Sequence, residues 1–581
     1  MNSSFLSKTL LSLCAILLLF SSGLASNTNT MWSHKAGSDI NWQQLTDLGT
    51  LLVGTDDGVS CFDPESGKVL WKRDYKKPSE SQVQEIHGTP ILLVSENSGW
   101  GQPKTKLTAL NLIDGTTLWE SEKIKGATVN VLPVYPKNMV IVTTVQNASA
   151  NKDKPDIIAF DMVDGSVLWE SELPDKVDLH AVENAGKYFV KFDLSGHQAP
   201  FADEDSLYYT CAGLHRFDLK TGKLLWGVPY DVTEGKIKQG NAQAVVDGEL
   251  VYTSAKGQLR AIDKNTGTVK WTSKDFGGAV AELVVRGNVI YGRLGGNFYD
   301  WSKREWQLKK PLGVVTVNKQ SGSAIAMYDK MKESVTNMAI IDDQKSLLIA
   351  DADNLIGLTI DDAGSLRESF KVKLEFKKKI GAMDVAGTAL KIGFGGIGAL
   401  AKKKGQDDGD DHPVAISLRE NGTAVVRGKQ HVLAFDPRSK TIAWSVKYEA
   451  PGVPGWQKAV MFGLTAFSYA MNTGIAANSY YGTSENYWAN KNRVNAIRDY
   501  SAFVSKRYQA TKATGKYVYI LTNVQEGKEK GAGLIGVNLD TGETNRQVML
   551  KDKTPDYKVD EIMGRVFNIR DNKEIVAYPV Q

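Results

Sequence analysis

The eleven residues "AFDMVDGSVLW", Ala159–Trp169, decide the fold of this chain. An apolar strand ends at Asp161, whose carboxylate can accept hydrogen bonds from backbone N–H groups in the turn that follows. Gly165 supplies the positive φ that closes a short hairpin with a bulge. The returning strand places Trp169 at a fixed distance from the turn, where its ring can pack on a neighbouring unit. The stretch predicts one hairpin of a repeated all-β unit.

The same spacing of Asp or Asn, Gly and Trp recurs along the chain. The other complete copies are Asp63–Gly67–Trp71, Asn111–Gly115–Trp119, Asp218–Gly222–Trp226 and Asp263–Gly267–Trp271. A further copy keeps Asp436 and Trp444 but has Lys440 at the Gly position, and weaker copies contain Asn318 with Gly322, Gly364, and Asn538 with Gly542. Two more strand-like runs precede each motif, so each unit holds about four strands, as a propeller blade does.

These copies resemble the repeats of the PQQ-like (pyrroloquinoline-quinone-type) β-propeller family. The repeat type also resembles that of the propeller lipoprotein of the outer-membrane β-barrel assembly machinery, from which this chain departs in its length, its insertions and its missing lipobox. We therefore predict an all-β propeller of four-stranded blades, spanning residues 26–581. We expect about eight blades, possibly more: the resemblance implies eight, whereas nine motif traces plus one shared blade give a larger ring unless some weak traces are inserted hairpins.

The two ends of the chain are predicted to complete one blade together. The C-terminal "RVFNIRDNKEIVAYPVQ" reads as the inner strands of a blade that lacks its last strand. The N-terminal "NTMWSHKA" contains Trp32 followed by a polar pair, like the fourth strands of other repeats. Pairing these segments closes the ring and removes a sheet edge.

The composition and the N-terminus indicate an exported globular protein. The chain has 581 residues, 42% of them hydrophobic, and its net charge of +4 gives no reason to expect nucleic acid. Residues 1–25 read as a secretory signal peptide cut after Ala25, with a retained anchor as the alternative. Cys14 lacks a small residue before it, so a lipoprotein is not expected. Cys61 and Cys211 lie in distant repeats and are predicted to be unpaired, half-buried thiols.

Two insertions, at about 377–412 and 450–505, interrupt the repeats. The first contains "FKKKIGAMDVAGTALKIGFGGIGALAKKKG", Phe376–Gly405, and the second is uncharged from Ala459 to Ser484. Both are expected in connections from a fourth strand to the next blade, so they would emerge on one face and pack as a small, partly helical subdomain. A single membrane crossing is disfavoured because blades on both sides of it must share one compartment.

Three interpretations of these insertions stay open. The two segments can pack on each other or plug the propeller face, since apolar insertions usually bury themselves. They can bind a partner, since a large exposed apolar surface normally marks an interface. They can also lie against a membrane surface. The candidate partner or membrane contacts are Trp456, Phe462, Phe467, Tyr469 and Phe394.

The resemblance also implies a possible quinone enzyme. Family dehydrogenases hold the quinone beside Ca²⁺ on the propeller axis with carboxylate and amide side chains, and many have an adjacent-cysteine disulfide that this chain lacks. No local motif matches the remaining cofactor ligands. The run "DDGDDHP", Asp407–Pro413, reads as a solvated acidic loop rather than a calcium site. "DADN", Asp351–Asn354, reads as a hairpin turn, and His215 as a packed or exposed residue rather than a catalytic one.

The sequence therefore favours a non-enzymatic scaffold or protein-binding module of a bacterial cell envelope, periplasmic or envelope-associated. No catalytic residue, metal ligand or cofactor is predicted. The alternatives are a PQQ-dependent oxidoreductase of the alcohol or sugar dehydrogenase type, with calcium, and a peripheral membrane propeller that uses its apolar insertions. An envelope protein is the expected partner.

Overall fold

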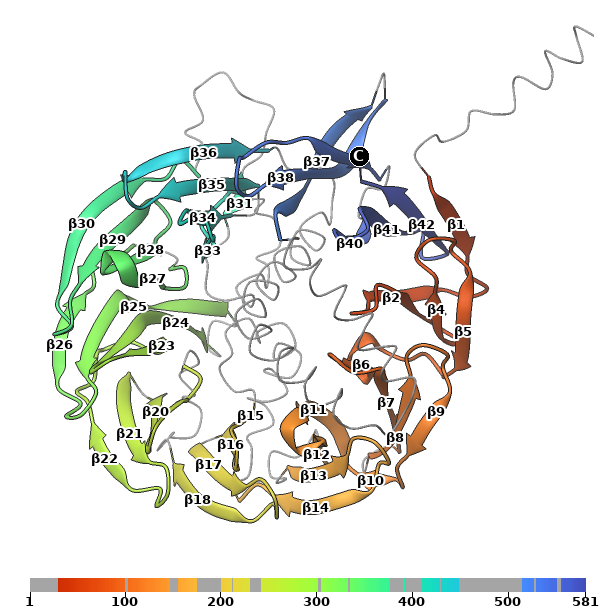
Figure 1. Ribbon diagram of the computed structural model, residues 1–581, viewed down its shortest axis with the longest axis horizontal. Helices are drawn as coiled ribbons and strands as arrows, with labels where there is room; N and C mark the ends of the chain where they lie inside the picture. The colour runs from red at the N-terminus through yellow and green to blue at the C-terminus, as the bar shows by residue number, and fades with distance from the viewer. Residues whose placement is uncertain are drawn as a thin grey trace, which may run out of the picture.

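The computed structural model is a ring of small antiparallel sheets around a central axis (Figure 1). It describes residues 30–99, 103–146, 155–174, 200–211, 213–229, 242–255, 257–300, 305–332, 335–376, 390–391, 409–428, 430–448, 515–526, 529–550 and 555–580. Within these ranges no helix is long and apolar enough to cross a membrane.

The first five sheets follow the chain from the N-terminal side. Each contains four strands in sequence order, and the second sheet also includes the short strand β10 (Ile124–Lys125) beside β8. They are β2 (Ile40–Leu45), β3 (Leu51–Thr55), β4 (Gly58–Phe62) and β5 (Val69–Asp74); β6 (Val83–Ile86), β7 (Ile91–Ser98), β8 (Lys104–Asn111) and β9 (Thr117–Glu120); β11 (Ala127–Val134), β12 (Met139–Val145), β13 (Asp156–Asp161) and β14 (Val167–Glu172); β15 (Phe201–Ala202), β16 (Ser206–Cys211), β17 (Gly213–Asp218) and β18 (Leu224–Pro229); and β19 (Val245–Asp247), β20 (Leu250–Ala255), β21 (Gln258–Asp263) and β22 (Val269–Thr272).

Five more sheets complete the ring. They are β23 (Val280–Arg286), β24 (Val289–Asp300), β25 (Glu305–Asn318) and β26 (Ala324–Tyr328); β27 (Ala339–Ile341), β28 (Ser346–Ala350), β29 (Asn354–Ile360) and β30 (Leu366–Lys373); β33 (Ala415–Leu418), β34 (Ala424–Arg427), β35 (His431–Asp436) and β36 (Thr441–Lys447); β37 (Tyr517–Glu526), β38 (Glu529–Asn538) and β39 (Arg546–Met549); and β40 (Asp556–Asp560), β41 (Arg565–Arg570) and β42 (Glu574–Pro579) with β1 (Trp32–Lys35).

The remaining elements are short. Strand β10 (Ile124–Lys125) pairs with β8, and β31 (Leu390–Lys391) pairs in parallel with β32 (Gly409–Asp410). Three 3-10 turns are described, η1 (Glu80–Gln82), η2 (Tyr135–Lys137) and η4 (Asp342–Gln344).

The prediction of an all-β propeller with four-stranded blades is confirmed. The described residues form ten blades, more than the family norm of about eight and equal to the nine motif traces plus one shared blade. The β37–β39 blade shows three strands. Because the turn from Asn538 to Gly542 joins β38 to β39, these are its second to fourth strands.

The ring closes through its two ends, as predicted. Strand β1 pairs antiparallel with β42, with Trp32 opposite Ala577 and Lys35 opposite Glu574. The Trp32 indole Nε1 donates to the Pro64 carbonyl of the next blade at 2.9 Å. The fourth strand of the last blade therefore comes from the N-terminal part of the chain, which removes the edge that β42 would otherwise present.

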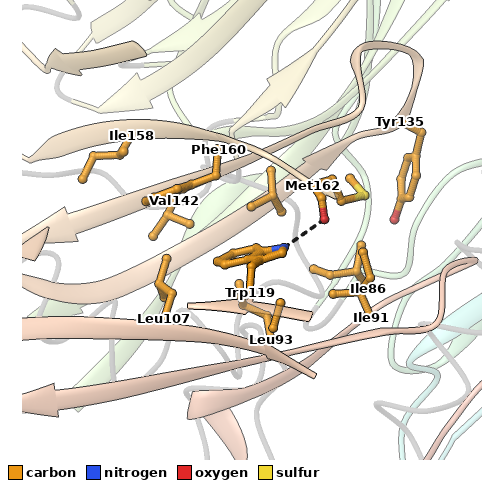
Figure 2. Packing of buried hydrophobic residues seen from close by; sticks show 12 residues of the cluster. Ile86, Ile91, Leu93, Leu107, Trp119, Tyr135, Val142, Ile158, Phe160 and Met162 are labelled. Atoms are coloured by element: carbon orange, nitrogen blue, oxygen red, sulfur yellow. Dashed lines mark hydrogen bonds between the residues drawn. The ribbon is translucent and has the colours of Figure 1, made fainter. Parts of the chain in front are cut away.

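The core of the protein lies between the blades. Each of the ten clusters of buried apolar residues contains side chains from two neighbouring blades, and together they run round the whole ring. In the cluster of Figure 2, Trp119 of β9 lies among Leu93, Leu107, Val142 and Phe160. One blade alone cannot bury both of its faces, so its stability depends on its neighbours.

The repeat motif links each blade to the next. The Asp161 Oδ1 accepts from the Val163 backbone N at 2.8 Å, and the Gly165 N donates to the Asp161 carbonyl at 3.0 Å. The Trp119 ring of the preceding blade lies over Gly165, and its Nε1 donates to the Met162 carbonyl at 3.1 Å. The turn thus forms the surface on which the Trp of the preceding blade packs, which we call the Trp seat.

Lys440 shows why one motif can lack its glycine. It occupies the turn position with φ 58°, so an L-residue tolerates this conformation here. The preceding blade carries no Trp at its outer strand, and Phe370 lies instead over Gly357 of its own blade. Because no indole covers the turn, a side chain at position 440 has room, and its Nζ lies 5.7 Å from the Phe370 ring centroid.

The prediction of half-buried thiols needs correction at Cys61. Its side chain is fully buried between the first two blades and is unpaired. Desolvation by burial raises the pKa of the thiol to about 12, so it stays protonated and unreactive. The side chain of Cys211, and Cys14 with the signal segment 1–25, lie outside the described residues.

Candidate functional site

The Asp and Asn residues of the repeat motif form hydrogen bonds within their own turns. The side-chain oxygens of Asp63, Asn111, Asp218, Asp263, Asn318, Asp436 and Asn538 each accept a backbone N–H two or three residues ahead. In several of these turns a serine, threonine or lysine side chain also contacts the motif carboxylate. These contacts hold the pKa of Asp263 down to about 2, with the Lys270 hydrogen bond as the largest cause. The motif carboxylates are thus engaged in turn formation.

The candidate partner or membrane contacts lie outside the described residues. These are Trp456, Phe462, Phe467, Tyr469 and Phe394, together with the predicted contact between the two insertions. The chain leaves the outer strand β30 before the first insertion and the outer strand β36 before the second.

The sequence predicted that the acidic run Asp407–Pro413 is a solvated loop, and this prediction needs correction in the described part of the run. Asp411 and His412 are buried. The Asp411 carboxylate accepts from the Gln430 and His412 backbone N atoms, both at 2.9 Å. The carboxylate thus caps the β34–β35 hairpin, a tertiary contact that the charge pattern alone does not indicate.

Two other sequence assignments agree with the structure. The "DADN" stretch is the hairpin between β28 and β29, and the Asp351 carboxylate accepts from the Asn354 N at 2.7 Å. His215 is a packed residue of β17, opposite Gly227 of β18.

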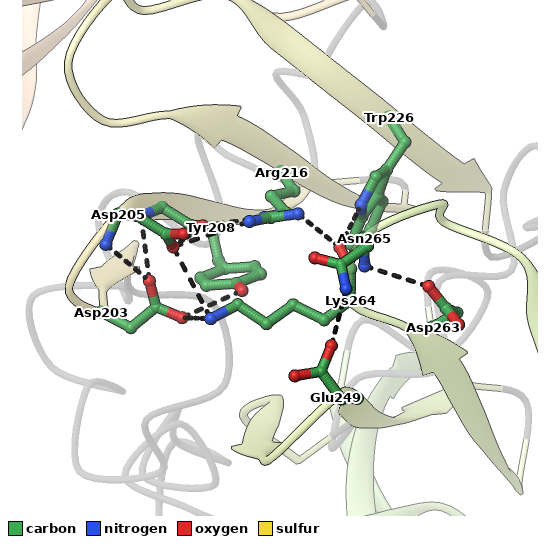
Figure 3. A network of polar contacts seen from close by, with 10 residues as sticks. Asp203, Asp205, Tyr208, Arg216, Trp226, Glu249, Asp263, Lys264 and Asn265 are labelled. Atoms are coloured by element: carbon green, nitrogen blue, oxygen red, sulfur yellow. Dashed lines mark hydrogen bonds and ion pairs between the residues drawn. The ribbon is translucent and has the colours of Figure 1, made fainter.

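A polar network joins two neighbouring blades on the side of the repeat turns (Figure 3). The Lys264 ammonium, next to the motif Asp of its blade, lies 2.9 Å from Asp203 and 3.6 Å from Asp205 of the preceding blade. The buried Arg216 donates to the Lys264 carbonyl at 2.6 Å and to the Ser206 hydroxyl at 2.8 Å. The same carbonyl also accepts from Trp226, so this network reinforces the Trp seat.

We expect Lys264→Met to lower the free energy of unfolding by about 1 kcal/mol, because it leaves the half-buried Asp203 carboxylate without its ammonium partner. The loss should shrink as salt rises, since screening weakens the pair. Urea unfolding at low and high ionic strength measures both effects. Lys72→Met is the control, because the Lys72–Asp74 pair is 3.8 Å apart and its side chains are 50% and 92% exposed. An equal loss in both variants would contradict the assignment.

The described residues bring together one group of three or more possible metal-ligating side chains, namely Asp47, Glu85 and His87. Asp47 lies in the turn after β2, whereas Glu85 and His87 lie at the end of β6 in the next blade. The His87 Nδ1 is 3.2 Å from Asp47 Oδ2, and the Asp47 N donates to both Glu85 oxygens at 3.0 and 3.1 Å. Glu85 is buried, while Asp47 and His87 are half-buried.

The carboxylates control the protonation of His87. Burial disfavours the imidazolium, but the hydrogen bond and the charge of Asp47, with the charge of Glu85, outweigh it and raise the pKa of His87 to about 9. At neutral pH, His87 is therefore a cation paired with Asp47, across the boundary between two blades.

This pair predicts a pH dependence of stability. The folded pKa of His87 lies above its ordinary value of 6.5, so the stabilisation is fully present below pH 6.5 and is lost as pH rises through about 9. We expect the stability difference between wild type and His87→Gln, with EDTA present, to be largest at pH 6 and to vanish above pH 9. Thermal midpoints across this range measure the difference. A constant difference would show that His87 acts through packing alone.

Sequence reasoning missed this group because Asp47 precedes Glu85 and His87 by 38 and 40 residues, and the three positions match no metal-binding spacing. The available signal was positional. All three residues lie where the first strand of a blade ends, in two consecutive repeats, and a ring fold brings these strand ends together.

The one group of three possible metal ligands among the described residues does not fit the calcium ion that accompanies a quinone, because it contains an imidazole, which calcium seldom accepts as a ligand. The motif carboxylates are engaged in their turns.

The fold and its repeat can now be compared with known proteins. The sequence pattern of the PQQ_2 family, described as "Outer membrane protein assembly factor BamB", matches residues 24–191 and 210–339, more than half of the chain. The chain belongs to this family. Membership of this BamB-like family supports the interpretation of the chain as an envelope-associated propeller that interacts with proteins. No curated protein matches the sequence.

Solved structures with similar folds are distant in sequence. BamB from Moraxella catarrhalis is 15% identical, with a TM-score of 0.34, and the match covers 70% of this chain and 96% of that one. The quinohemoprotein alcohol dehydrogenase ADHIIG from Pseudomonas putida HK5 is 12% identical, with a TM-score of 0.31, covering 96% and 77%. The computationally designed Ika8 protein is 13% identical, with a TM-score of 0.34, covering 72% and 99%.

Proposed function

We propose that this protein is an exported, non-enzymatic propeller that binds protein partners as a scaffold in the bacterial cell envelope. The observation that carries the proposal is membership of a family described by an outer membrane protein assembly factor. The signal-peptide pattern of residues 1–25 supports export. The proposal needs no cofactor, and it assigns the motif carboxylates to turn formation.

The outer wall of the ring, formed by the fourth strands of the blades, also has features that favour protein binding. Its fourth strands expose apolar side chains beside the motif turns, including Val69, Leu70, Leu118, Val167, Leu168 and Leu225, with exposed fractions of 42–50%. The described fourth strands also have one sheet edge each, which can accept a further strand. The insertions, with Trp456, Phe462 and Phe467, are the second candidate surface, and we place the main partner contact there.

Capture from cross-linked envelope extracts tests the proposal. Tagged full-length protein is compared with an insertion variant (Trp456→Ala, Phe462→Ser, Phe467→Ser) and a wall variant (Leu70→Glu, Leu168→Glu). The control carries Lys72→Gln and Glu170→Gln, two exposed changes on the same outer strands. We expect a defined partner with wild type and control, and its loss with the insertion variant.

Other outcomes would contradict parts of the proposal. Loss with the wall variant alone would move the contact to the outer strands, and no reproducible partner would overturn the scaffold function. Enzymatic function is tested separately by incubation with PQQ and Ca²⁺. Quinone absorbance retained through gel filtration, together with dye reduction by alcohols or sugars, would show that the protein is an enzyme.

A further inference from the structure

We propose that Asp47, Glu85 and His87 form a binding site for a divalent transition-metal cation such as Zn²⁺, located between two neighbouring blades. One ligand atom from each residue lies within 4.8 Å of the other two. An imidazole nitrogen with two carboxylates is a donor set that suits Zn²⁺ and related cations, whereas Ca²⁺ and Mg²⁺ prefer oxygen ligands alone.

The distances are close to those of a shared coordination sphere. Two ligands that are each about 2.1 Å from a zinc ion lie roughly 3.4 Å apart in tetrahedral geometry. The Asp47 Oδ2 and His87 Nδ1 atoms are 3.2 Å apart, so both can contact one cation with little movement. The Glu85 carboxylate has to approach by up to about 1.4 Å, the difference between the 4.8 Å limit for the whole group and roughly 3.4 Å in tetrahedral geometry.

Backbone contacts already orient the two carboxylates. The Asp47 N donates to both Glu85 oxygens, and the Gly88 N donates to Asp47 Oδ2 at 3.1 Å. Such outer contacts fix ligand orientation in metal sites. Because the three ligands come from two blades, a bound cation would tie the blades together.

The test uses untagged full-length protein, stripped with EDTA and dialysed. Equilibrium dialysis against Zn²⁺ should give one tightly bound equivalent per chain. We expect Asp47→Asn, Glu85→Gln and His87→Gln each to weaken binding at least tenfold.

Matched controls separate a built site from surface binding. His34→Gln removes a histidine of β1, and Asp342→Asn removes a carboxylate that is 72% exposed. Both controls should bind Zn²⁺ like wild type. Circular dichroism in EDTA establishes that each variant is folded. The proposal is overturned if wild type binds no stoichiometric Zn²⁺, if folded Asp47 and His87 variants bind as tightly as wild type, or if the controls weaken binding equally.

Discussion

Gly165→Ala is expected to lower the free energy of unfolding by roughly 2–5 kcal/mol. Gly165 has φ 72°, where a Cβ costs about 1–2 kcal/mol. The added Cβ would also lie 2.5 Å from two ring atoms of Trp119, and such overpacking costs about 1–3 kcal/mol more. The indole is held by its hydrogen bond to the Met162 carbonyl and by a buried cluster, so it cannot easily move away. Urea unfolding measures the loss.

Gly248→Ala is the matched control for the cost of placing a Cβ on a residue with positive φ. Gly248 has φ 60°, and a Cβ there would meet no atom within 4 Å. The difference between the two variants therefore isolates the clash with Trp119. A second check is Lys440→Gly, which should change stability by less than about 1 kcal/mol because no indole covers that turn. If Gly165→Ala and Gly248→Ala cost the same, the turn is not a seat for the preceding Trp.

Much of the fold was predictable because each repeat encodes its own hairpin and its contact with the next blade. The weak copies also formed blades. Asn318 and Asn538 cap their turns without a complete motif, since the capping side chain and the buried strands are enough. The expectation of about eight blades, possibly more, followed the family norm. Counting the nine motif traces with the shared blade gives the ten blades that the described residues form, because even the weak copies each mark one blade.

The candidate sites were harder to predict because they depend on contacts between blades. The acidic run before Pro413 has the composition of a solvated loop, yet Asp411 is buried and accepts a hydrogen bond from the Gln430 backbone N. Likewise, Asp47 and His87 have no sequence relationship beyond their places at two strand ends. Their proximity follows from the ring geometry. Composition predicts what one segment prefers, whereas a tertiary contact requires two segments to be placed together.

Removal of the N-terminal strand is expected to have the largest effect on stability. Deletion of residues 26–37 removes β1, whose Trp32 lies over Gly67, donates to the Pro64 carbonyl and packs near Phe567. Loss of a packed Trp alone costs about 3–5 kcal/mol. The deletion also exposes the edge of β42, which can then pair with a second molecule. We expect a lower midpoint of unfolding and concentration-dependent association, measured by urea titration and light scattering.

Addition of the missing strand as a peptide provides the control. A synthetic peptide of residues 29–37 should restore monomer and raise the midpoint of the deletion variant, because the β42 edge and the Gly67 seat are both intact. The same peptide with Trp32→Ala can still form backbone bonds to β42 but cannot fill the seat, so it should restore much less. Equal rescue by both peptides would show that edge pairing alone closes the ring. A monomeric deletion variant with an unchanged midpoint would show that closure by β1 contributes little, and that the cluster between the last and first blades holds the ring together by itself.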